Sequence, residues 1–370
     1  MSRALLAALV MTAAAVVSAA VVPASRLLAA RLGVMDAPGP RKIHARPTPR
    51  MGGVAVFVAF NVVVWAGYFL LPYLTEVEWL RGPFGPALAL LEEAHRVRGK
   101  LFALFAGSAL VFVVGLADDV LGKDFPVWAK AAGQAAAAVV LMSSGVMTSF
   151  LPFEWMNQLV TLFWLFGITN AFNLLDNMDG LSAGVAFVAC AVLLINAWSL
   201  GAFFISLLLV AFMGCLLGFL AFNFHPASVF LGDCGSLFIG YVLASLTLLE
   251  RYVTQSSSTL FPVLMPVMVC AVPLVDTATV MFIRLWERRP IYVGDARHLS
   301  HRLVSMGFHP RSAVLILYLL TLTLGLGAAS LTHATVGQSL LVLLQSLGFV
   351  ALILVLMFVE RRQVRRETKT

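Results

Sequence analysis

The sequence predicts an all-α, polytopic membrane protein with about eleven transmembrane helices. Of its 370 residues, 61% are hydrophobic and 12% are charged, whereas soluble proteins average about 45–50% apolar and about 25% charged residues. The mean hydropathy is +0.94. The apolar stretches reach membrane-spanning length and lack the alternation of barrel strands, so we expect them to cross the bilayer as helices.

Eleven apolar stretches come near the length of about 20 residues that a transmembrane helix needs. In chain order they are Leu5 to Ala30, Gly53 to Leu74, Leu101 to Leu116, Val127 to Met147, Trp155 to Phe172, Leu181 to Trp198, Phe203 to Phe222, Ser236 to Leu249, Leu260 to Ile283, Val314 to Leu331 and Leu340 to Val359. The third and the eighth are short. The first ends at Arg26 and Arg31 without a clear cleavage site, so we expect a span rather than a signal peptide.

The distribution of charge predicts an external N-terminus and a cytoplasmic C-terminus. Cytoplasmic loops carry an excess of Lys and Arg, and this orientation places most of the 25 lysines and arginines inside. It also places every aspartate on the cytoplasmic side or in the inner half of a span, which predicts a metal or phosphate site at that face. The cytoplasmic loops expected in this single membrane domain are 31–52, 117–126, 173–180, 223–235 and 284–312, followed by a basic tail at 361–370.

The most polar loop is Asn170–Leu181, where carboxylates and amides separate two apolar spans. Acidic residues between membrane segments are costly unless they are functional. Four of its polar residues are three positions apart, namely Asn170, Asn173, Asp176 and Asp179. On a continuous helix each would turn back by about 60°, so the four would fan over about half the circumference and line a cleft. A plain polar turn is the alternative, because Asn, Asp and Gly suit turns.

Two further acidic positions lie at helix ends. Asp118 and Asp119 close the third span, and adjacent helical residues point about 100° apart. One is therefore expected to face a site while the other caps, supports or binds a second partner. Asp233 starts the eighth span between Gly232 and Gly235, and these glycines would let a ligand approach the backbone. A role for Asp233 as a helix N-cap is the alternative.

Two basic loops complete the polar set. The segment Asp36–Gly53 carries Arg50, and much of its charge is expected to be a topological signal. The segment Arg284–Arg311 contains His298, His301 and Arg302. The two histidines have i, i+3 spacing and would share a helix face. Beside arginines, they suit phosphate contacts better than a metal site.

Several classes of function are excluded or disfavoured. The chain has no GxxxxGK[ST], HExxH or GxGxxG motif, and its four cysteines form no CxxC pair. The net charge of +7 is concentrated in loops, which indicates topology and anionic ligands rather than nucleic acid. Carboxylates with open positions suit Mg²⁺ or Mn²⁺, which bridge phosphate oxygens. Carboxylates and basic residues at one membrane face together predict phosphoryl transfer between a soluble anion and a substrate from the bilayer.

Six motifs follow one another between Asp36 and Arg302. They are Pro-Thr-Pro-Arg-Met-Gly-Gly (47–53), Gly-Leu-Ala-Asp-Asp (115–119), Asn-Ala-Phe-Asn-Leu-Leu-Asp-Asn-Met-Asp-Gly-Leu (170–181), Pro-Ala-Ser-Val-Phe-Leu-Gly-Asp-Cys-Gly-Ser (226–236), Pro-Leu-Val-Asp-Thr (273–277) and His-Leu-Ser-His-Arg-Leu (298–303). Together they resemble the polyprenyl-phosphate N-acetylhexosamine-1-phosphate transferase family, which includes undecaprenyl-phosphate GlcNAc-1-phosphate transferases and phospho-MurNAc-pentapeptide translocases.

The resemblance implies a reaction and its participants. N-acetylhexosamine 1-phosphate, with GlcNAc as the expected sugar, passes from a UDP-sugar to polyprenyl (undecaprenyl) phosphate and gives polyprenyl-diphosphate-sugar and UMP. Mg²⁺ is the implied cofactor, with Mn²⁺ as a substitute. The enzyme would lie in the cytoplasmic (inner) membrane with its active site on the cytoplasmic face. It would initiate a cell-envelope polysaccharide such as lipopolysaccharide or teichoic acid, and a homodimer is left open.

The resemblance also implies roles by matching position. Asp233 would bind Mg²⁺, with Asp179 as a second metal-site residue. Asp118 would face the lipid phosphate as a candidate base, with Asp119 beside it. The implied catalytic set is Asp118, Asp119, Asp176 and Asp179. The implied substrate-binding set is Asn170, Asn173, Lys130, Arg50, His298, His301 and Arg302.

Two positions depart from the family pattern. Members often have Gly where Asn177 stands and His where Ser300 stands, so the turn or the uracil pocket is expected to differ and one imidazole is missing. The spans, the basic tail and the spaced histidines favour the GlcNAc branch over the MurNAc-pentapeptide branch, which stays the alternative. A cation-coupled transporter is the alternative from another class, but no internal repeat is visible. An intramembrane aspartyl protease fits less well, because the Gly-Asp pairs at 232–233 and 294–295 lack deep membrane placement.

Overall fold

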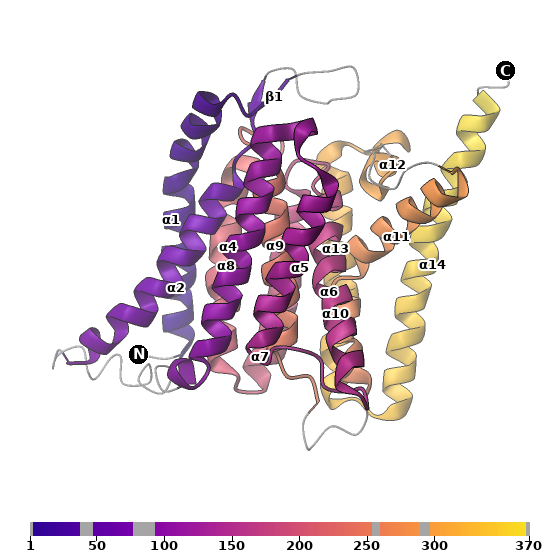
Figure 1. Ribbon diagram of the computed structural model, residues 1–370. Helices are drawn as coiled ribbons and strands as arrows, with labels where there is room; N and C mark the ends of the chain where they lie inside the picture. Colours follow the sequence, from indigo (N-terminus) through magenta and orange to yellow (C-terminus); the bar gives the residue numbers. More distant parts are fainter. Residues whose placement is uncertain (1–2, 38–46, 77–92, 254–259, 289–296, 368–370) are drawn as a thin grey trace.

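The computed structural model describes residues 3–37, 47–76, 93–253, 260–288 and 297–367, which form a bundle of helices (Figure 1). The helices are α1 (Arg3–Leu32), α2 (Gly53–Glu76), α4 (Arg98–Leu121), α5 (Val127–Ser143), α6 (Glu154–Leu175), α7 (Leu181–Ser199), α8 (Phe203–Asn223), α9 (Gly232–Leu249), α10 (Met265–Val269), α11 (Ala271–Trp286), α12 (Leu299–Ser305), α13 (Pro310–Ser330) and α14 (Val336–Glu367). The 3-10 helices are η1 (Gly122–Asp124), η2 (Phe261–Leu264) and η3 (Leu331–His333). Two strands, β1 (Met35–Asp36) and β2 (Thr48–Pro49), pair antiparallel. The predicted all-α polytopic fold is confirmed.

Each of the eleven predicted spans corresponds to a helical segment, but they differ in length and straightness. Among the described residues, nine helices are long and apolar enough to cross a membrane. The pair Phe261–Val269 and Ala271–Trp286 is long and apolar enough only when both helices are taken together, and it bends by 68° at its break, where a single continuous span was predicted. The remaining segment, α5, has 17 residues, a length of about 25 Å that lies at the lower limit for a span. It packs between α4 and α6.

The bend between α10 and α11 has a local cause. Pro273 lies in the first turn of α11 and has no backbone N–H. In a continuous helix this residue would leave the carbonyl of Val269 without its usual donor. The chain breaks at Cys270 instead, which has φ −94° and ψ 15°, so α11 starts in a new direction.

Helix α9 lies at the centre of the bundle. It packs against α2, α4, α6, α7 and α8, and 83% of its apolar window is buried within the chain. The peripheral α14 has only 11% of its window buried, which leaves its apolar face for lipid. Because α9 begins at Gly232, the central helix delivers Asp233 to one end of the bundle.

The beginnings of α2 and α9 touch through two glycines. A Cβ added to Gly53 would lie 2.2 Å from the Cα of Gly235, so neither position accepts a side chain. The N–H of Gly53 also donates to the carbonyl of Leu231 at 2.8 Å. The sequence predicted that glycines beside Asp233 admit a ligand, whereas Gly235 instead admits the backbone of another helix.

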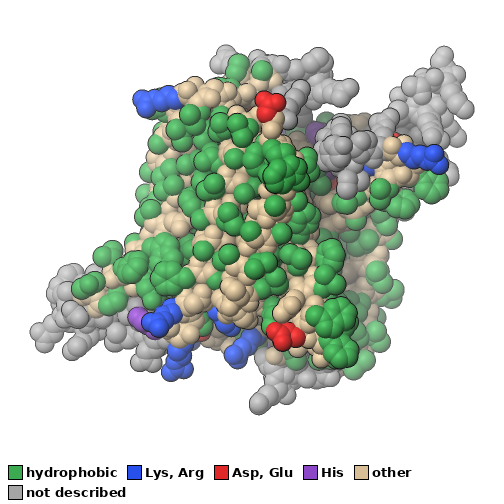
Figure 2. All heavy atoms as spheres, viewed as in Figure 1, with side chains coloured by type: hydrophobic (Ala, Val, Ile, Leu, Met, Phe, Trp, Pro, Cys, Tyr) green, Lys and Arg blue, Asp and Glu red, His purple; other side chains and the backbone are tan. Residues whose placement is uncertain are grey.

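The polar loops gather at one end of the bundle. The termini lie at opposite ends, and the end with the C-terminus, at the top of Figure 1, also carries β1 and α12. Figure 2 shows hydrophobic side chains over the middle of the visible face and charged side chains toward its ends, as a membrane requires. That the polar end is cytoplasmic stays a prediction. Parts of the predicted loops and tail, at 38–46, 289–296 and 368–370, lie outside the described residues.

Candidate active site

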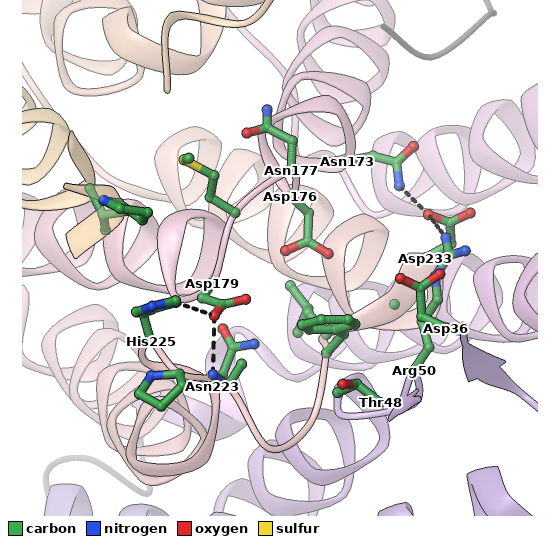
Figure 3. A pocket seen from close by; sticks show the side chains of 18 of the residues that line it. Asp36, Thr48, Arg50, Asn173, Asp176, Asn177, Asp179, Asn223, His225 and Asp233 are labelled. Atoms are coloured by element: carbon green, nitrogen blue, oxygen red, sulfur yellow. Dashed lines mark hydrogen bonds and ion pairs between the residues drawn. The ribbon is translucent and has the colours of Figure 1, made fainter. Parts of the chain in front are cut away.

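A cavity of about 660 Å³ lies among the β1–β2 segment, the α6–α7 turn, the α8–α9 loop and α12 (Figure 3). Its polar lining residues are Asp36, Thr48, Arg50, Asn173, Asp176, Asn177, Asp179, Asn223, His225, Asp233 and His301. Its apolar lining includes Met178, Pro226, Phe230, Pro310 and Val314. Polar groups at fixed positions within partly apolar walls are typical of small-molecule sites.

Lys130 joins four helices at the edge of this cavity. Its Nζ donates to Asp118 Oδ2 at 2.7 Å and to Asn173 Oδ1 at 3.1 Å. The same Nζ lies 3.5 Å from Asp233 Oδ2. Asn173 Nδ2 in turn donates to Asp233 Oδ1 at 2.8 Å. One lysine, one amide and two carboxylates from α4, α5, α6 and α9 thus form a single network.

Arg50 adds a second cation from the segment after β2. Its Nη2 lies 3.4 Å from Asp233 Oδ1, and its Nε lies 3.5 Å from Asp119 Oδ1. Burial opposes the charged form of Arg50, but the carboxylates of Asp233 and Asp119 outweigh it and raise the pKa of Arg50 above its ordinary value. Arg50 is therefore a permanent positive charge at the cavity wall.

Asp118 and Asp119 point to different partners, as their helical offset predicts. Asp118 contacts Lys130, whereas Asp119 accepts the backbone N–H groups of Asp233 and Cys234, both at 2.9 Å. The side chain of Asp119 has no exposed area. It caps the N-terminus of α9 and, together with Arg50, holds that helix in place. Its position is that of a supporting residue rather than of a group that touches substrate.

The polar loop after α6 is a turn rather than a continuation of the helix. Helix α6 ends at Leu175, and α7 begins after Gly180, which has a left-handed φ of 74°. Only Asn170 and Asn173 of the predicted fan are helical. The prediction of one helical row was wrong in this respect, because the turn redirects Asp176 and Asp179.

Asp176 points into the middle of the cavity (Figure 3). In the described part of the chain its carboxyl group makes no hydrogen bond. Burial raises the pKa of Asp176 to about 8, although the charge of Arg50 opposes this. The group is therefore largely protonated at neutral pH and would ionise when a cation enters the cavity.

Asp179 lies apart from Asp233 in the cavity (Figure 3). Its Oδ2 lies 2.8 Å from His225 Nδ1 and accepts the N–H of Ala227 at 3.1 Å. These contacts orient the imidazole of His225, because a carboxylate can only accept a hydrogen bond. The structure therefore does not bring Asp179 together with Asp233, its predicted partner at the metal.

Asn170 does not line the cavity. Its Nδ2 donates to Gln134 Oε1 and to the carbonyl of Phe166, and Gln134 Nε2 donates back to Asn170 Oδ1 at 3.3 Å. This pair links α5 to α6 one turn below Lys130 and Asn173. Asn170 was predicted to bind substrate, but its amide is used between helices.

The three residues predicted to bind phosphate in the segment Arg284–Arg311, which are His298, His301 and Arg302, also differ in their positions relative to the cavity. Helix α12 begins at Leu299, so His298 precedes it and the two histidines do not share a helix face as predicted. His298 Nδ1 lies 2.7 Å from Asp276 Oδ2 in a buried pair. Arg302 is 4% exposed, and its Nε donates to the carbonyl of Arg297. Of the three predicted ligands in this loop, His301 lines the cavity.

Several residues of the site were not in the predicted catalytic, substrate-binding or metal sets, among them Asp36, Thr48 and Asn177 in the cavity wall. His225 and Asn223 line the cavity, and Asn223 Oδ1 accepts the N–H of Gly180 at 3.0 Å, which ties the α8–α9 loop to the α6–α7 turn. Asp276 supports α12 through Leu299 N at 2.7 Å. His225 and Asn223 belong to a polar run that the sequence marks, and Asp276 is an acid within an apolar span.

The donor set suits Mg²⁺ that arrives with phosphate. In the described ranges, no three His, Cys, Asp or Glu side chains converge on a ready-made metal site. Mg²⁺ usually takes one or two carboxylates and completes its shell with phosphate oxygens and water. Asp233 and Asp176 both line the cavity, and Asp176 is free of hydrogen bonds among the described residues. These residues fit such an ion.

Comparison with known proteins identifies a family profile and several similar sequences. Residues 101–250 match the profile of the family described as glycosyl transferase family 4. A probable undecaprenyl-phosphate N-acetylglucosaminyl 1-phosphate transferase of Bacillus subtilis is 32% identical over 90% of this chain and 86% of its own length. A decaprenyl-phosphate N-acetylglucosaminephosphotransferase of Mycobacterium tuberculosis is 33% identical over 86% of this chain and 81% of its own. The undecaprenyl-phosphate alpha-N-acetylglucosaminyl 1-phosphate transferase of Salmonella typhi is 28% identical over 80% and 76%.

Proposed function

Because this chain belongs to the polyprenyl-phosphate N-acetylhexosamine-1-phosphate transferase family, we propose that it transfers N-acetylglucosamine 1-phosphate from a UDP-sugar to polyprenyl phosphate in the cytoplasmic membrane. The observation that carries this proposal is the network of Lys130, Asp118, Asn173, Asp233 and Arg50 at the cavity edge. Two anionic substrates repel each other, and fixed cations among carboxylates are the groups that phosphoryl transfer needs.

The reaction balances without a further reactant. An oxygen of polyprenyl phosphate forms a bond to the β-phosphorus of the UDP-sugar. The bond from that phosphorus to the oxygen shared with the α-phosphate breaks, and this oxygen leaves with UMP. The products are polyprenyl-diphosphate-sugar and UMP, and the number of phosphate charges does not change.

The UDP-sugar is assigned to the cavity. A volume of about 660 Å³ lies within the range of about 300–1,000 Å³ for small-molecule sites. Arg50 and His301 lie in its walls and would bind the diphosphate, while the apolar lining suits the flat faces of a nucleoside.

The lipid phosphate is assigned to the other side of the network. Asp118 and Lys130 are not among the residues that line the cavity, yet Lys130 contacts Asn173 and Asp233, which are. A phosphate beside Lys130 would thus lie next to the donor without occupying its space. Asp118, which pairs with Lys130, would orient this lysine or take a proton from the incoming phosphate.

A magnesium ion would be held by Asp233, with Asp176 in the place that the sequence assigned to Asp179. Mg²⁺ would supply charge stabilisation for the diphosphate. We prefer Asp176 because the oxygen of Asp179 that faces His225 is already in use. Asn173 would hold Asp233 in orientation through its 2.8 Å hydrogen bond.

Purified protein in detergent tests the proposal. Polyprenyl phosphate and a panel of UDP-sugars (UDP-GlcNAc, UDP-GalNAc and UDP-MurNAc-pentapeptide) are supplied with Mg²⁺, and UMP release is measured. We expect release with UDP-GlcNAc that requires the lipid and stops when EDTA removes the metal. If protein that is shown to be folded releases no UMP with any of these sugars, the proposed activity is contradicted. Release that persists without metal would contradict only the cofactor assignment.

A further inference from the structure

A hydrogen bond joins two walls of the cavity. Ser300 Oγ in α12 donates to Asn177 Oδ1 in the α6–α7 turn at 2.6 Å, across 123 positions of sequence. Asn177 lines the cavity, and Ser300 is 2% exposed. Because water has little access to Ser300, the loss of Asn177 leaves the buried hydroxyl of Ser300 without this partner.

Asn177 is held on its own side of this contact. Its Nδ2 donates to the carbonyl of Leu174 at 2.9 Å, and its backbone N–H donates to Leu175 at 2.8 Å. Among the described non-glycine residues, Arg288 alone has a positive φ, so the turn does not require glycine at position 177. The contribution of Asn177 therefore lies in its side chain, which reaches from the end of α6 to α12.

Helix α12 depends on such contacts because it has only seven residues, and a helix of that length is not stable alone. At its N-terminus, Asp276 of α11 accepts the N–H of Leu299 at 2.7 Å and pairs with His298. At the next residue, Ser300 bonds to Asn177. These hydrogen bonds to α11 and to the α6–α7 turn add to the packing of α12 against α13 and α14.

The contact lies directly beside two residues of the donor cavity. His301 follows Ser300 in α12, and Asp176 precedes Asn177 in the turn, and both line the cavity. The 2.6 Å bond therefore restricts how far His301 can move from Asp176. A diphosphate with its cation between these two side chains would require that spacing to be constant.

We propose that Asn177 and Ser300 are a positioning pair that docks α12 and sets the spacing between His301 and Asp176, and thereby the affinity for the sugar-nucleotide donor. Neither residue needs to touch the reacting atoms. The effect on donor affinity rests on the proposed function, whereas the docking of α12 does not.

Kinetics of Asn177→Ala, Ser300→Ala and the double variant test the effect on the donor. We expect each single change to raise the KM for the UDP-sugar about three- to ten-fold, the scale of one hydrogen bond, with kcat within about two-fold. Because both changes break the same bond, the double variant should be little worse than either. Ser300→Thr keeps the hydroxyl and should restore most of the affinity. Ser330→Ala serves as the matched control. It removes a serine hydroxyl at the C-terminal end of α13 that donates to the carbonyl of Gly327 in the same helix.

Limited trypsin digestion tests docking without any substrate. Arg302 in α12 is 4% exposed, so cleavage after it reports release of this helix. We expect faster cleavage in Ser300→Ala and Asn177→Ala than in the wild type or Ser330→Ala. Unchanged trypsin cleavage together with an unchanged KM overturns the inference. So does a double variant whose increase in KM equals the product of the increases in the two single variants. If the wild type releases no UMP yet Ser300→Ala speeds cleavage, the proposed activity fails and the docking role stands.

Discussion

The two ends of α9 each present a carboxyl group, half-buried in Asp233 and buried in Glu250, in opposite electrostatic settings. At the first turn, Asp233 lies within 3.5 Å of Arg50 and Lys130. Just past the last turn, Glu250 Oε1 accepts the Asn196 amide at 2.8 Å, and Glu250 Oε2 has no hydrogen-bond partner in the described structure. A helix N-terminus favours negative charge, and a C-terminus opposes it.

This difference separates the metal-binding role proposed for Asp233 from the structural role of Glu250. Burial raises the pKa of Glu250 to about 8, and the hydrogen bond from Asn196 offsets this only in part, so the group is largely neutral at pH 7. Asn196 also accepts from Thr332 at 2.8 Å and donates to the carbonyl of Arg251, which ties α7 to α9 and η3. Burial alone therefore does not identify a functional acid. Cationic partners and an adjacent cavity distinguish Asp233.

The sharpest test of this contrast exchanges each acid for its amide. We expect Asp233→Asn to lower turnover by roughly 10²–10⁴-fold, because the charge needed for a metal and for Lys130 is lost. Glu250→Gln should leave turnover within about two-fold. UMP release is measured on matched amounts of inserted protein. Near-normal turnover of Asp233→Asn would refute its metal role.

Asp118→Asn is expected to have the next largest effect, a loss of about 10²-fold in turnover. The change removes the carboxylate that Lys130 contacts at 2.7 Å. Asp124→Asn, in the exposed η1 turn six residues later, is the matched control and should be nearly silent. Equal losses in the two variants would remove Asp118 from the site.

Asp119→Asn should act on α9 itself. The two carboxylate oxygens each accept one N–H group from the start of α9 at 2.9 Å, and in asparagine one of these oxygens is replaced by an NH₂ group that can only donate. We expect the protein to lose about 1–2 kcal/mol of stability, as after loss of a helix cap, with turnover lowered about ten-fold or less. A thermal melt and UMP assay on one preparation measure both. Turnover as low as in Asp233→Asn, at unchanged stability, would indicate direct participation in the reaction.

Glu250→Gln is expected to have the smallest effect on turnover, but it should change how the stability of the protein depends on pH. Its pKa is about 8 in the folded protein and about 4.3 in an unfolded chain, so the folded state holds a proton that the unfolded state releases between these values. The free energy of unfolding should therefore fall by at most about 1.4 kcal/mol per pH unit from about pH 5 to 8 and then level off. Glu250→Gln should remove this part of the slope in thermal melts from pH 5 to 9. An unchanged slope would contradict the buried neutral acid.

The membrane helices could be predicted because their signal is local. A run of apolar residues must cover the bilayer wherever it packs, and every predicted span is helical. The bend between α10 and α11 was missed because a proline near a helix start is tolerated in many helices. In this chain Pro273 instead coincides with a break at Cys270.

The acids of the site could be predicted as a group, but their individual roles could not. Asn170 and Asn173 differ by about 60° on α6, and this rotation is enough to turn one toward Gln134 and the other toward Asp233. Asp179 pairs with His225 at a distance of 46 positions in sequence. Contacts of this kind depend on how loops dock, which the spacing of residues within one segment does not describe.

The contact between Gly53 and Gly235 limits how this site can change by mutation. In most tight contacts between helices, an enlarged residue can be compensated by a smaller one opposite. Here both partners already lack a side chain, and a Cβ on either would meet the main chain of the other at 2.2 to 2.6 Å. A substitution at one position thus has no compensating substitution at the other. The alignment of Arg50 with Asp233 therefore rests on two glycines that cannot be replaced one at a time or together.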